Sequence, residues 1–492
     1  MKRYQHYIDG AFVDPAGQEW FETVNPYTAK PWAEIARGTA ADMERAVDAA
    51  HLALHKGEWA AYTASQRGAL LRRIGDLIAE NAEFLAEVEV RDNGKLMAEM
   101  LGQLRYLPNY YYYYGGLADK IEGSVMPLDK KGYFAYSEYE PLGVIGIITP
   151  WNSPLNLTTW KLAPALAAGN TVVIKPSEFT SASMLELVSL IEKAGAPPGL
   201  VNVVTGFGAD VGPALTDNPK VAKIAFTGSD ETGRKIYAAA AKTMKHVTME
   251  LGGKSPNIIF DDANLEDAVN GAISGIFAAT GQTCIAGSRL LVQNSIHDEV
   301  VERLVKIAGT ARMGDPSRME TQVGPVTTMP QYEKVLSYID IAKGEGARLV
   351  TGGFPAKRSE CGNGWFVEPT IFDDVTADMR IAQEEVFGPV LSILRFDDEE
   401  DAIEIANNTI YGLAAGVWTA DIARAFRMSK GLRAGTVWIN TYRAISYMVP
   451  FGGYKQSGIG RENGAEMIKE YLQTKSVWID IGAAKSNPFV QR

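Results

Sequence analysis

Between residues 141 and 440 the chain alternates short apolar runs with longer amphipathic stretches. Runs such as 143–149 and 171–175 have the length of buried strands, and stretches such as 155–168 and 181–193 carry apolar residues at helical spacing. This order is typical of βαβ units around a parallel sheet. Because the apolar runs do not alternate with polar residues, we expect helices on both faces of the sheet. The pattern predicts an α/β fold with doubly wound sheets.

The alternation falls into two series, which predicts two Rossmann-like α/β domains. The first series continues with strands at 200–205, 222–226 and 247–250. The second begins near Asn257, with strand candidates at 288–293, 388–395, 412–418 and 435–439. Gly252 and Gly253 lie between the two series, where glycine's conformational freedom suits a joint between domains.

Two segments outside these series predict a small third element. Residues 133–140 alternate apolar and polar side chains, which is typical of a half-exposed or edge strand, and 475–481 is similar in character. We expect the two to form a β element that covers its edges against another subunit. The tyrosine run at 110–114 indicates helix packing in preference to an aromatic binding platform.

The amino-acid composition limits which cellular compartment and which binding partners we expect for the chain. The formal net charge of −11 argues against a nucleic acid or an anionic membrane held by bulk electrostatics. Two cysteines cannot build a disulfide framework for 492 residues, so a reducing, cytoplasmic compartment is expected. No segment approaches the roughly 20 apolar residues of a membrane span. Residues 1–14 lack the pattern of a secretory leader.

A doubly wound sheet directs attention to nucleotide sites, but the usual motifs are missing. Two glycine triplets, 206/208/212 and 458/460/464, are one residue too long for G-x-G-x-x-G. A P-loop ending at Lys254 would need a glycine where Thr248 stands. What remains is the segment from Phe226 to Ser229, a strand end followed by small residues and a helix start. Its N–H groups could hold a pyrophosphate, or Ser229 could be a plain helix cap.

The sequence predicts no metal site. His51 and His55 are spaced i, i+4, but Leu52 stands where a zinc-protease motif requires glutamate, and no cluster of cysteine or histidine accompanies them. The acidic run 397–401 lacks the glycine spacing of a calcium loop and is interpreted as a solvated helix start.

Three polar residues lie at strand ends or on a turn, where a catalytic site would need reactive side chains. Cys284 lies on a turn of small residues between a helix and a strand, as a nucleophile would, although a buried structural cysteine fits too. Glu250 ends an apolar strand, so it is either a general base in a ligand crevice or a salt-bridged strand end. Asn152 also follows a strand, as a turn residue or as an oxyanion donor. Together they specify a nucleophile, a base and an oxyanion donor.

The chain also resembles a known family. It closely resembles the aldehyde dehydrogenase superfamily in an ordered set of motifs that runs over nearly the whole chain. These motifs are Pro150, Trp151 and Asn152; Lys175 to Glu178; Phe226 to Ser229; Glu250 to Lys254; Gly281 to Cys284; Glu385 to Pro389; and Pro450 to Gly453.

The resemblance implies roles for five residues in oxidising an aldehyde to its acid. Cys284 matches the nucleophile that forms a thiohemiacetal and then, after hydride loss to the nicotinamide, a thioester. Asn152 and the Cys284 backbone N–H match the oxyanion donors. Glu250 matches the base that activates water to hydrolyse the thioester, and Lys161 and Glu462 match a proton-relaying pair behind it.

The resemblance also implies a dinucleotide site. Glu178 bears on its identity, because a carboxylate accepts hydrogen bonds from a ribose diol and repels a 2′-phosphate, so NAD is expected over NADP. The cofactor-binding residues expected are Thr149, Pro150, Trp151, Lys175, Ser177, Glu178, Gly208, Phe226, Gly228, Ser229, Leu251, Glu385 and Phe387.

The substrate is less constrained. The residues expected to line its pocket are Ser153, Leu157, Thr283, Ile285, Arg443 and Phe451. Arg443 could hold a remote carboxylate bidentately, which would favour a carboxylated semialdehyde, or it could be an exposed or structurally paired arginine.

The resemblance further implies a division of the chain and leaves alternatives open. Residues 1–120 and 141–251 are the expected cofactor-binding domain, 252–452 the catalytic domain, and 121–140 and 470–492 the oligomerisation element of a homodimer or homotetramer, with 453–469 returning to the cofactor domain. A CoA-acylating semialdehyde dehydrogenase, a non-catalytic binding protein with the same fold, and a cofactor-free thiol esterase are the alternatives.

Overall fold

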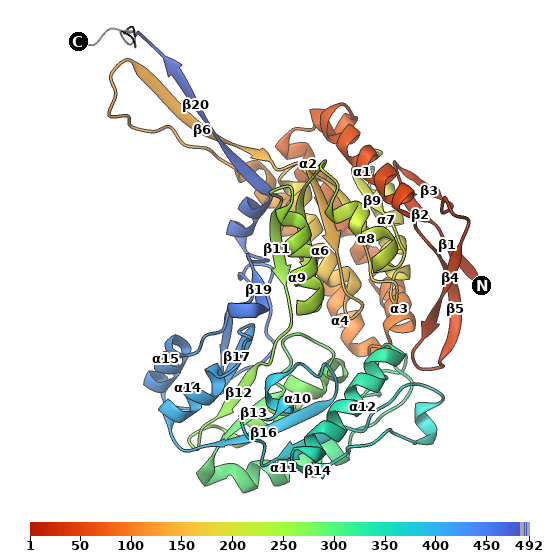
Figure 1. The fold of residues 1–492 in the computed structure, drawn as a ribbon, viewed down its shortest axis with the longest axis vertical. Coiled ribbons are helices and arrows are strands. Elements are labelled where there is room, and N and C mark those ends of the chain that lie inside the picture. The colour runs from red at the N-terminus through yellow and green to blue at the C-terminus, as the bar shows by residue number, and fades with distance from the viewer. Residues whose placement is uncertain (483–486, 488, 490–492) are drawn as a thin grey trace.

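Two α/β bodies and a projecting β ribbon make up the computed structural model, which describes residues 1–482, 487 and 489 (Figure 1). The first body is built on an eight-stranded sheet whose five central strands are parallel. In spatial order the strands are β19 (Gly458–Ile459), β11 (His246–Glu250), β10 (Val221–Thr227), β7 (Val144–Ile148), β8 (Thr171–Lys175), β9 (Val201–Val203), β2 (His6–Ile8) and β3 (Ala11–Val13).

Helices cover both faces of this sheet, as the unbroken apolar runs predict. On one face, α1 (Ala40–His55), α8 (Gly208–Thr216) and α9 (Asp230–Ala241) pack on side chains such as Val144 and Val173. On the other, α6 (Pro154–Ala167) and α7 (Ala182–Lys193) pack on neighbours such as Ile145 and Val172. Successive strand residues point to opposite faces, so each strand contributes to two cores.

Four further N-terminal helices form an outer layer against α6 and α7. They are α2 (Ala64–Glu80), α3 (Ala82–Asn93), α4 (Met97–Tyr106) and α5 (Pro108–Leu117). The tyrosine run lies in α5, and Tyr110, Tyr111 and Tyr114 are almost fully buried. The interpretation as helix packing is confirmed.

Strands β1 (Lys2–Tyr4), β5 (Lys30–Ala36) and β4 (Trp20–Asn25) form a separate small sheet.

The second body contains a seven-stranded, mostly parallel sheet. Its order is β14 (Arg348–Thr351), β15 (Thr370–Asp373), β16 (Val390–Phe396), β13 (Arg289–Gln293), β12 (Pro256–Ile259), β17 (Ala414–Trp418) and β18 (Thr436–Ile439). The helices of this body are α10 (Leu265–Phe277), α11 (His297–Gly309), α12 (Met329–Gly344), α13 (Arg380–Gln383), α14 (Glu399–Asn407) and α15 (Ile422–Gly431). Four of these strands match predicted segments, whereas β12, β14 and β15 have only four residues each and were not predicted.

The predicted third element is an antiparallel ribbon. Strand β6 (Tyr133–Pro141) pairs along its whole length with β20 (Leu472–Asp480), although 331 residues separate the partners Leu472 and Pro141. The ribbon projects away from both bodies (Figure 1). The end of the predicted element, beyond residue 482, lies mostly outside the described residues.

Within the described part of the chain, no helix has both the length and the apolarity needed to cross a bilayer.

Arg289 fastens the second sheet to the link that follows Glu250. The side chain is fully buried, and its guanidinium donates to three backbone oxygens, those of Lys254 (2.9 Å), Ile405 (3.0 Å) and Ala406 (2.7 Å). Buried carbonyl groups are costly to leave without a donor, and this one side chain supplies a donor to the buried Lys254 and Ala406 carbonyls and a second donor to that of Ile405, which also accepts the Asn408 N–H.

We expect Arg289→Met to destabilise the fold by about 2–5 kcal/mol, because it leaves the Lys254 and Ala406 carbonyls without the donor that Arg289 supplies. Urea denaturation followed by tryptophan fluorescence measures the change. Arg303→Met is the matched control, because Arg303 is exposed and its one ion pair among the described residues is with Glu299 on its own helix. A loss for Arg289→Met no larger than that of the control would contradict this role.

Candidate active site

The carboxyl ends of three parallel strands, β7, β10 and β11, meet the second body at one small cavity. Its volume is about 130 Å³. The loop after β7 contributes Asn152, the segment after β11 contributes Leu251 and Gly252, and the turn before β13 contributes Cys284. Across from them lie Glu385 and Phe387. The carboxyl ends of parallel strands, where open α/β sheets bind ligands, thus form one wall of the cavity.

A second cavity of about 680 Å³ adjoins the first, with which it shares residues such as Trp151 and Gly228. Its volume is within the range of pockets for cofactors and drug-sized ligands. Ten of the predicted cofactor-binding residues line it: Thr149, Pro150, Trp151, Lys175, Ser177, Glu178, Gly208, Phe226, Gly228 and Ser229. The other three, Leu251, Glu385 and Phe387, line the smaller cavity.

A strained turn presents Cys284. Ala279 and Thr280 have left-handed backbone angles (φ 53° and 55°), and Gly281 follows at 69°. Residues other than glycine rarely adopt this region, and holding them there costs of order 1–3 kcal/mol each. Surrounding contacts offset that strain: Glu99 accepts the Ala279 N–H at 2.8 Å, and the Thr280 hydroxyl donates to the Gly324 carbonyl at 3.2 Å.

The next residue of the turn, Gln282, joins it to both bodies. The Asn152 side-chain amide donates to the Gln282 carbonyl at 2.9 Å, and the Gln282 side chain donates to the Pro325 carbonyl and accepts the Thr327 N–H. Gly253 passes so close that an added Cβ would lie 2.5 Å from the Cys284 carbonyl oxygen. A glycine is therefore required there for contact, in addition to its predicted position at a domain joint.

Glu250 lies beside a buried ion pair. The Lys161 ammonium is 2.5 Å from the Glu462 carboxylate, and it also donates to the Thr227 hydroxyl at 2.6 Å. Neither Glu250 oxygen has a hydrogen-bond partner among the described residues, and Glu250 does not line the cavity of Cys284. Gly452 leaves room for it, since a Cβ there would lie 2.8 Å from the Glu250 Oε1 atom.

Burial keeps the thiol and the carboxyl in their neutral forms. Cys284 is partly exposed to the cavity, but the surrounding protein excludes bulk water and raises its pKa to about 12, with Glu385 and Glu250 adding to the rise. The pKa of Glu250 is likewise raised well above its ordinary value, first by burial and then by Glu462. Deprotonation of either group is therefore favoured at alkaline pH.

The larger cavity has the donors and acceptors that a dinucleotide needs. Glu178 pairs with Lys175 at 3.0 Å and presents a carboxylate that suits a ribose diol. Ser229 caps α9, accepting the Thr232 N–H, and it also lines both cavities, so the cap and the phosphate interpretations are compatible. Trp151 and Phe387 meet edge to face, 5.3 Å between ring centroids, in the smaller cavity.

The predicted substrate residues are less closely grouped. Leu157 lines the cavity of Cys284, whereas Ser153, Thr283, Ile285, Arg443 and Phe451 line neither cavity. Phe451 packs edge to face on Trp160. Arg443 is half-buried and donates to the Ser274 carbonyl at 3.2 Å, so it is in part a structurally paired arginine.

Several residues of the site had no signal in the sequence. Glu99 lies on α4, far along the chain from the turn it supports. Gln331 and Lys334, from α12, line the cavity of Cys284, and Thr232 and Lys235, from α9, line the larger one. Thr232 and Lys235 follow Ser229 by three and six residues. Residues at this spacing lie on one face of a helix, so the helix start at Ser229 could have pointed to them.

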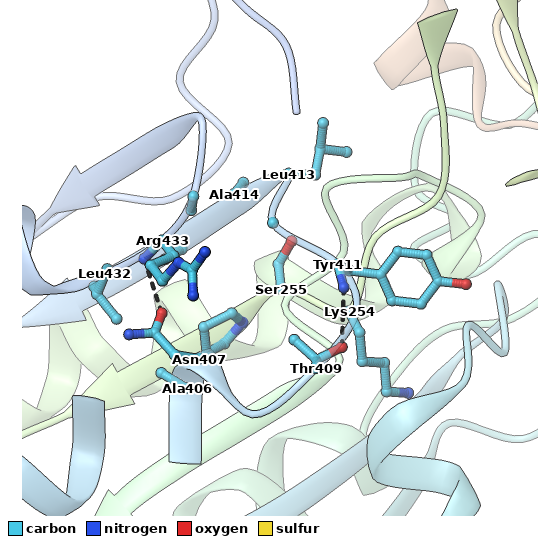
Figure 2. A pocket seen from close by; sticks show the side chains of 14 residues that line it. Lys254, Ser255, Ala406, Asn407, Thr409, Tyr411, Leu413, Ala414, Leu432 and Arg433 are labelled. Carbon is cyan, nitrogen blue, oxygen red and sulfur yellow. Dashed lines mark hydrogen bonds between the residues drawn. The ribbon is translucent and has the colours of Figure 1, made fainter. Parts of the chain in front are cut away.

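A third hollow lies behind the link between the two bodies and is too small for a ligand. Figure 2 shows Lys254 and Tyr411 on one side of it and Asn407 and Arg433 on the other. Its volume of about 10 Å³ has room for a single water at most. The Lys254 ammonium is buried without a hydrogen-bond partner in the part of the chain that the structure describes, and burial lowers its pKa to about 7.

The raised pKa of Cys284 predicts slow alkylation at neutral pH. Because only the thiolate reacts, the rate of Cys284 modification by iodoacetamide should rise about tenfold per pH unit between pH 7 and 9. Peptide mass spectrometry measures it, and the fully buried Cys361 serves as the internal reference. A fast rate that does not change over this interval would contradict the assigned environment.

Comparisons with known proteins agree with this geometry. The family model for the aldehyde dehydrogenase family matches residues 12–477. The chain is 46% identical, over all of both chains, to (Z)-2-((N-methylformamido)methylene)-5-hydroxybutyrolactone dehydrogenase of Acinetobacter baylyi. It is 44% identical to betaine aldehyde dehydrogenase of Bacillus subtilis, over 98% of this chain and 99% of that one.

A solved structure shows the same likeness in three dimensions. Betaine aldehyde dehydrogenase of Staphylococcus aureus, crystallised with NAD+, superimposes with a TM-score of 0.98 at 41% identity, covering 99% of this chain and 97% of that chain. The matched sequence, the shared fold and the position of Cys284 beside a dinucleotide-sized cavity lead to one conclusion. This chain belongs to the aldehyde dehydrogenase family.

Proposed function

We propose that the protein oxidises an aldehyde to its carboxylic acid with NAD, through a covalent intermediate on Cys284. One observation carries this proposal: Cys284 and Asn152 line the same small cavity, and that cavity adjoins a larger one lined by Lys175 and Glu178. A nucleophile, an amide donor and a dinucleotide-sized site are therefore neighbours. NAD, when bound, supplies the hydride acceptor.

The reaction begins with addition of the Cys284 sulfur to the aldehyde carbonyl. As the S–C bond forms, the thiol proton passes to solvent and the electron pair of the carbonyl π bond moves to the oxygen, which becomes an oxyanion. The Asn152 side chain is positioned near Cys284 by its bond to Gln282, and its second amide proton, together with the Cys284 N–H, can stabilise that oxyanion. Loss of hydride from the carbon then leaves a thioester on Cys284.

Glu250 is proposed to activate the water that hydrolyses this thioester. Within the described residues its two oxygens accept no hydrogen bond, so the deprotonated form of Glu250 can accept a proton from water, and Lys161 and Glu462 lie behind it to exchange that proton. A CoA-acylating enzyme of this fold would use CoA in place of water and would not need such a base. The presence of Glu250 at the end of β11 therefore supports hydrolysis over transfer to CoA.

The substrate is proposed to be a carboxylated semialdehyde. Ring opening of a 5-hydroxybutyrolactone, the group in the name of the Acinetobacter baylyi relative, gives an aldehyde and a carboxylate on one carbon chain. Arg443 is half-buried, and among the described residues one of its donors is taken, by the Ser274 carbonyl. Its other donors could hold the remote carboxylate.

The β6–β20 ribbon is proposed to join subunits of a homodimer or homotetramer. It carries exposed apolar side chains, among them Phe134, Trp478 and Ile479, on a two-stranded sheet with open edges. Such edges are usually covered in native proteins.

The proposed division of the chain has three parts. Residues 1–120 and 141–251 form the cofactor domain, 252–452 the catalytic domain, and 121–140 and 470–492 the oligomerisation element. Residues 453–469 return to the cofactor side, where β19 pairs with β11.

We expect Glu250→Gln to uncouple the two halves of the reaction. Rapid mixing with aldehyde and NAD should give a burst of one NADH per active site, followed by turnover reduced by about 10²–10⁴-fold, because the thioester still forms but loses its base. Glu266→Gln, an exposed change, is the control.

Two outcomes of that experiment would count against the proposal. Unchanged steady-state turnover in Glu250→Gln would remove Glu250 as the base. Restoration of turnover by CoA, with acyl-CoA as the product of the wild-type enzyme, would replace hydrolysis by acyl transfer.

Arg443→Ala tests the substrate class. It should raise KM for 4-oxobutanoate about tenfold or more, through loss of a charge-assisted hydrogen bond, while KM for butanal changes little. Arg318→Ala is the control, because Arg318 is exposed and lines neither cavity. Equal changes for both aldehydes would remove Arg443 as the carboxylate ligand.

A further inference from the structure

Two buried side chains of the N-terminal helical layer hold the segment that presents Asn152. The Lys95 ammonium donates to the Ser153 hydroxyl at 2.6 Å, and the Glu89 carboxyl group accepts the Leu155 N–H at 2.9 Å. Glu89 is fully buried, and Lys95 is 7% exposed. The two bonds therefore fix the residues one and three positions after Asn152. No sequence motif had pointed to either side chain.

The start of α6 depends on Glu89, because the helix's own residues do not complete it. The first N–H groups of a helix have no partner within the helix, and a serine at the N-cap position usually bonds one of them. Among the described residues, the Ser153 hydroxyl bonds none of these N–H groups, and Pro154 has no N–H. Glu89 replaces the cap by accepting from Leu155, which places an acid at the positive end of the helix dipole.

A closed circuit of hydrogen bonds joins Lys95 to the turn that presents the nucleophile. The Lys95 N–H donates to the Asn93 side chain at 2.8 Å, and the Thr327 hydroxyl donates to the Asn93 carbonyl at 2.6 Å. The Thr327 N–H donates to the Gln282 side chain at 2.9 Å, and the Gln282 carbonyl accepts from the Asn152 amide at 2.9 Å. The bond from Lys95 to the residue after Asn152 closes the circuit. The corner between α3 and α4 thus connects the amide donor to the turn through buried contacts.

Asp92, one turn further along α3, does for another helix what Glu89 does for α6. Its carboxyl group accepts the N–H of Ala182, the first residue of α7, at 3.0 Å, and the Thr23 hydroxyl at 2.6 Å. Asp92 is as deeply buried as Glu89. Within the described part of the chain, α7 contributes no residue to the cavity of Cys284. Asp92 is therefore a matched reference for Glu89.

We propose that Glu89 and Lys95 are positioning residues: they fix Asn152 in the place from which its amide stabilises the oxyanion. This inference rests on the proposed function and deepens it. Neither side chain is among the described residues that line the cavity of Cys284, so both act through Asn152 and not on the substrate. A displacement of about 1 Å at a reacting group can cost about 10²-fold in rate, so small movements of this segment would matter.

The test is a double-mutant cycle with Asn152→Ala. Rapid mixing with saturating 4-oxobutanoate and NAD gives the rate of first NADH formation, which reports addition and hydride loss. Glu89→Ala and Lys95→Met should each lower this rate about 10- to 100-fold and leave KM for NAD within about threefold. In the Asn152→Ala background the same changes should cost less than about threefold, because the donor that they position is gone.

Two further variants separate positioning from general support of the fold. Asp92→Ala removes the matched acid and should leave the rate of first NADH formation at saturating NAD within about threefold. Glu89→Gln should restore the rate to within about threefold of wild type, since its amide oxygen still accepts the Leu155 N–H. An equal loss in Asp92→Ala and Glu89→Ala would overturn the proposal.

The cycle itself can also overturn the proposal. Rate losses of equal size with and without the Asn152 side chain would make Glu89 and Lys95 supports of the fold only. If Lys95→Met or Glu89→Ala does not fold, Ser153→Ala removes the bond to Lys95 by a single atom. Its rate loss must likewise depend on Asn152, and a loss that is the same in both backgrounds would overturn the proposal.

Amide hydrogen exchange separates this inference from the proposed function, because it requires no turnover. Mass spectrometry should show exchange at the Leu155 amide at least about tenfold faster in Glu89→Ala, whereas Asp92→Ala should have this effect at Ala182 and not at Leu155. Unchanged exchange at Leu155 in Glu89→Ala would overturn the inference. Absence of NADH with every aldehyde in the wild-type enzyme, with exchange changed as expected, supports the placement of the segment and contradicts only the proposed function.

Discussion

The conformation of residues 279–282 decides where the thiol of Cys284 lies, and the rest of the site is arranged around it. Two non-glycine residues are held in left-handed geometry there, which is unfavourable unless the surroundings enforce it. The enforcing contacts come from distant parts of the chain: Glu99 on α4, Gly324 before α12, and Asn152 after β7. Both α/β bodies must therefore be folded and in contact before Cys284 reaches its position.

The same packing sets the electrostatics. Excluding bulk water from the joint raises the pKa of Cys284 and Glu250 and lowers the pKa of Lys95, so each group is less charged than it would be in water. An incoming aldehyde then meets few mobile water dipoles and a small number of fixed donors. In such surroundings each oriented hydrogen bond has a larger effect on a developing charge than it would in solvent.

The sequence predicted the parallel strands well because their signal is local. The segment 171–175 coincides with β8, and 143–149 and 247–250 differ from β7 and β11 by a residue or two. The short strands β12, β14 and β15 had no such signal, and their pairing is set by neighbours far along the chain. The sequence predicted that 133–140 and 475–481 form one β element, but the antiparallel pairing and the register of β6 and β20 came from the structure.

At the site, the sequence motifs predicted many of the residues that line the two cavities. They did not predict the hydrogen bonds that hold those residues in position. Glu99 and Lys95 lie on the N-terminal helical layer, in segments whose sequence resembles any amphipathic helix end. Their importance depends on which loop they meet after folding. Conversely, Phe451 and Ile285 were expected at the substrate pocket but line neither cavity, because their side chains pack into the core beside it.

The account depends on a covalent bond between the substrate carbon and the Cys284 sulfur. Its most direct test is intact-protein and peptide mass spectrometry of enzyme quenched within milliseconds of mixing with 4-oxobutanoate and NAD. We predict an added mass equal to the acyl group, located on the peptide that contains Cys284 and absent from Cys284→Ala. Production of NADH with no acyl adduct on Cys284, or with equal turnover by Cys284→Ala, would contradict it.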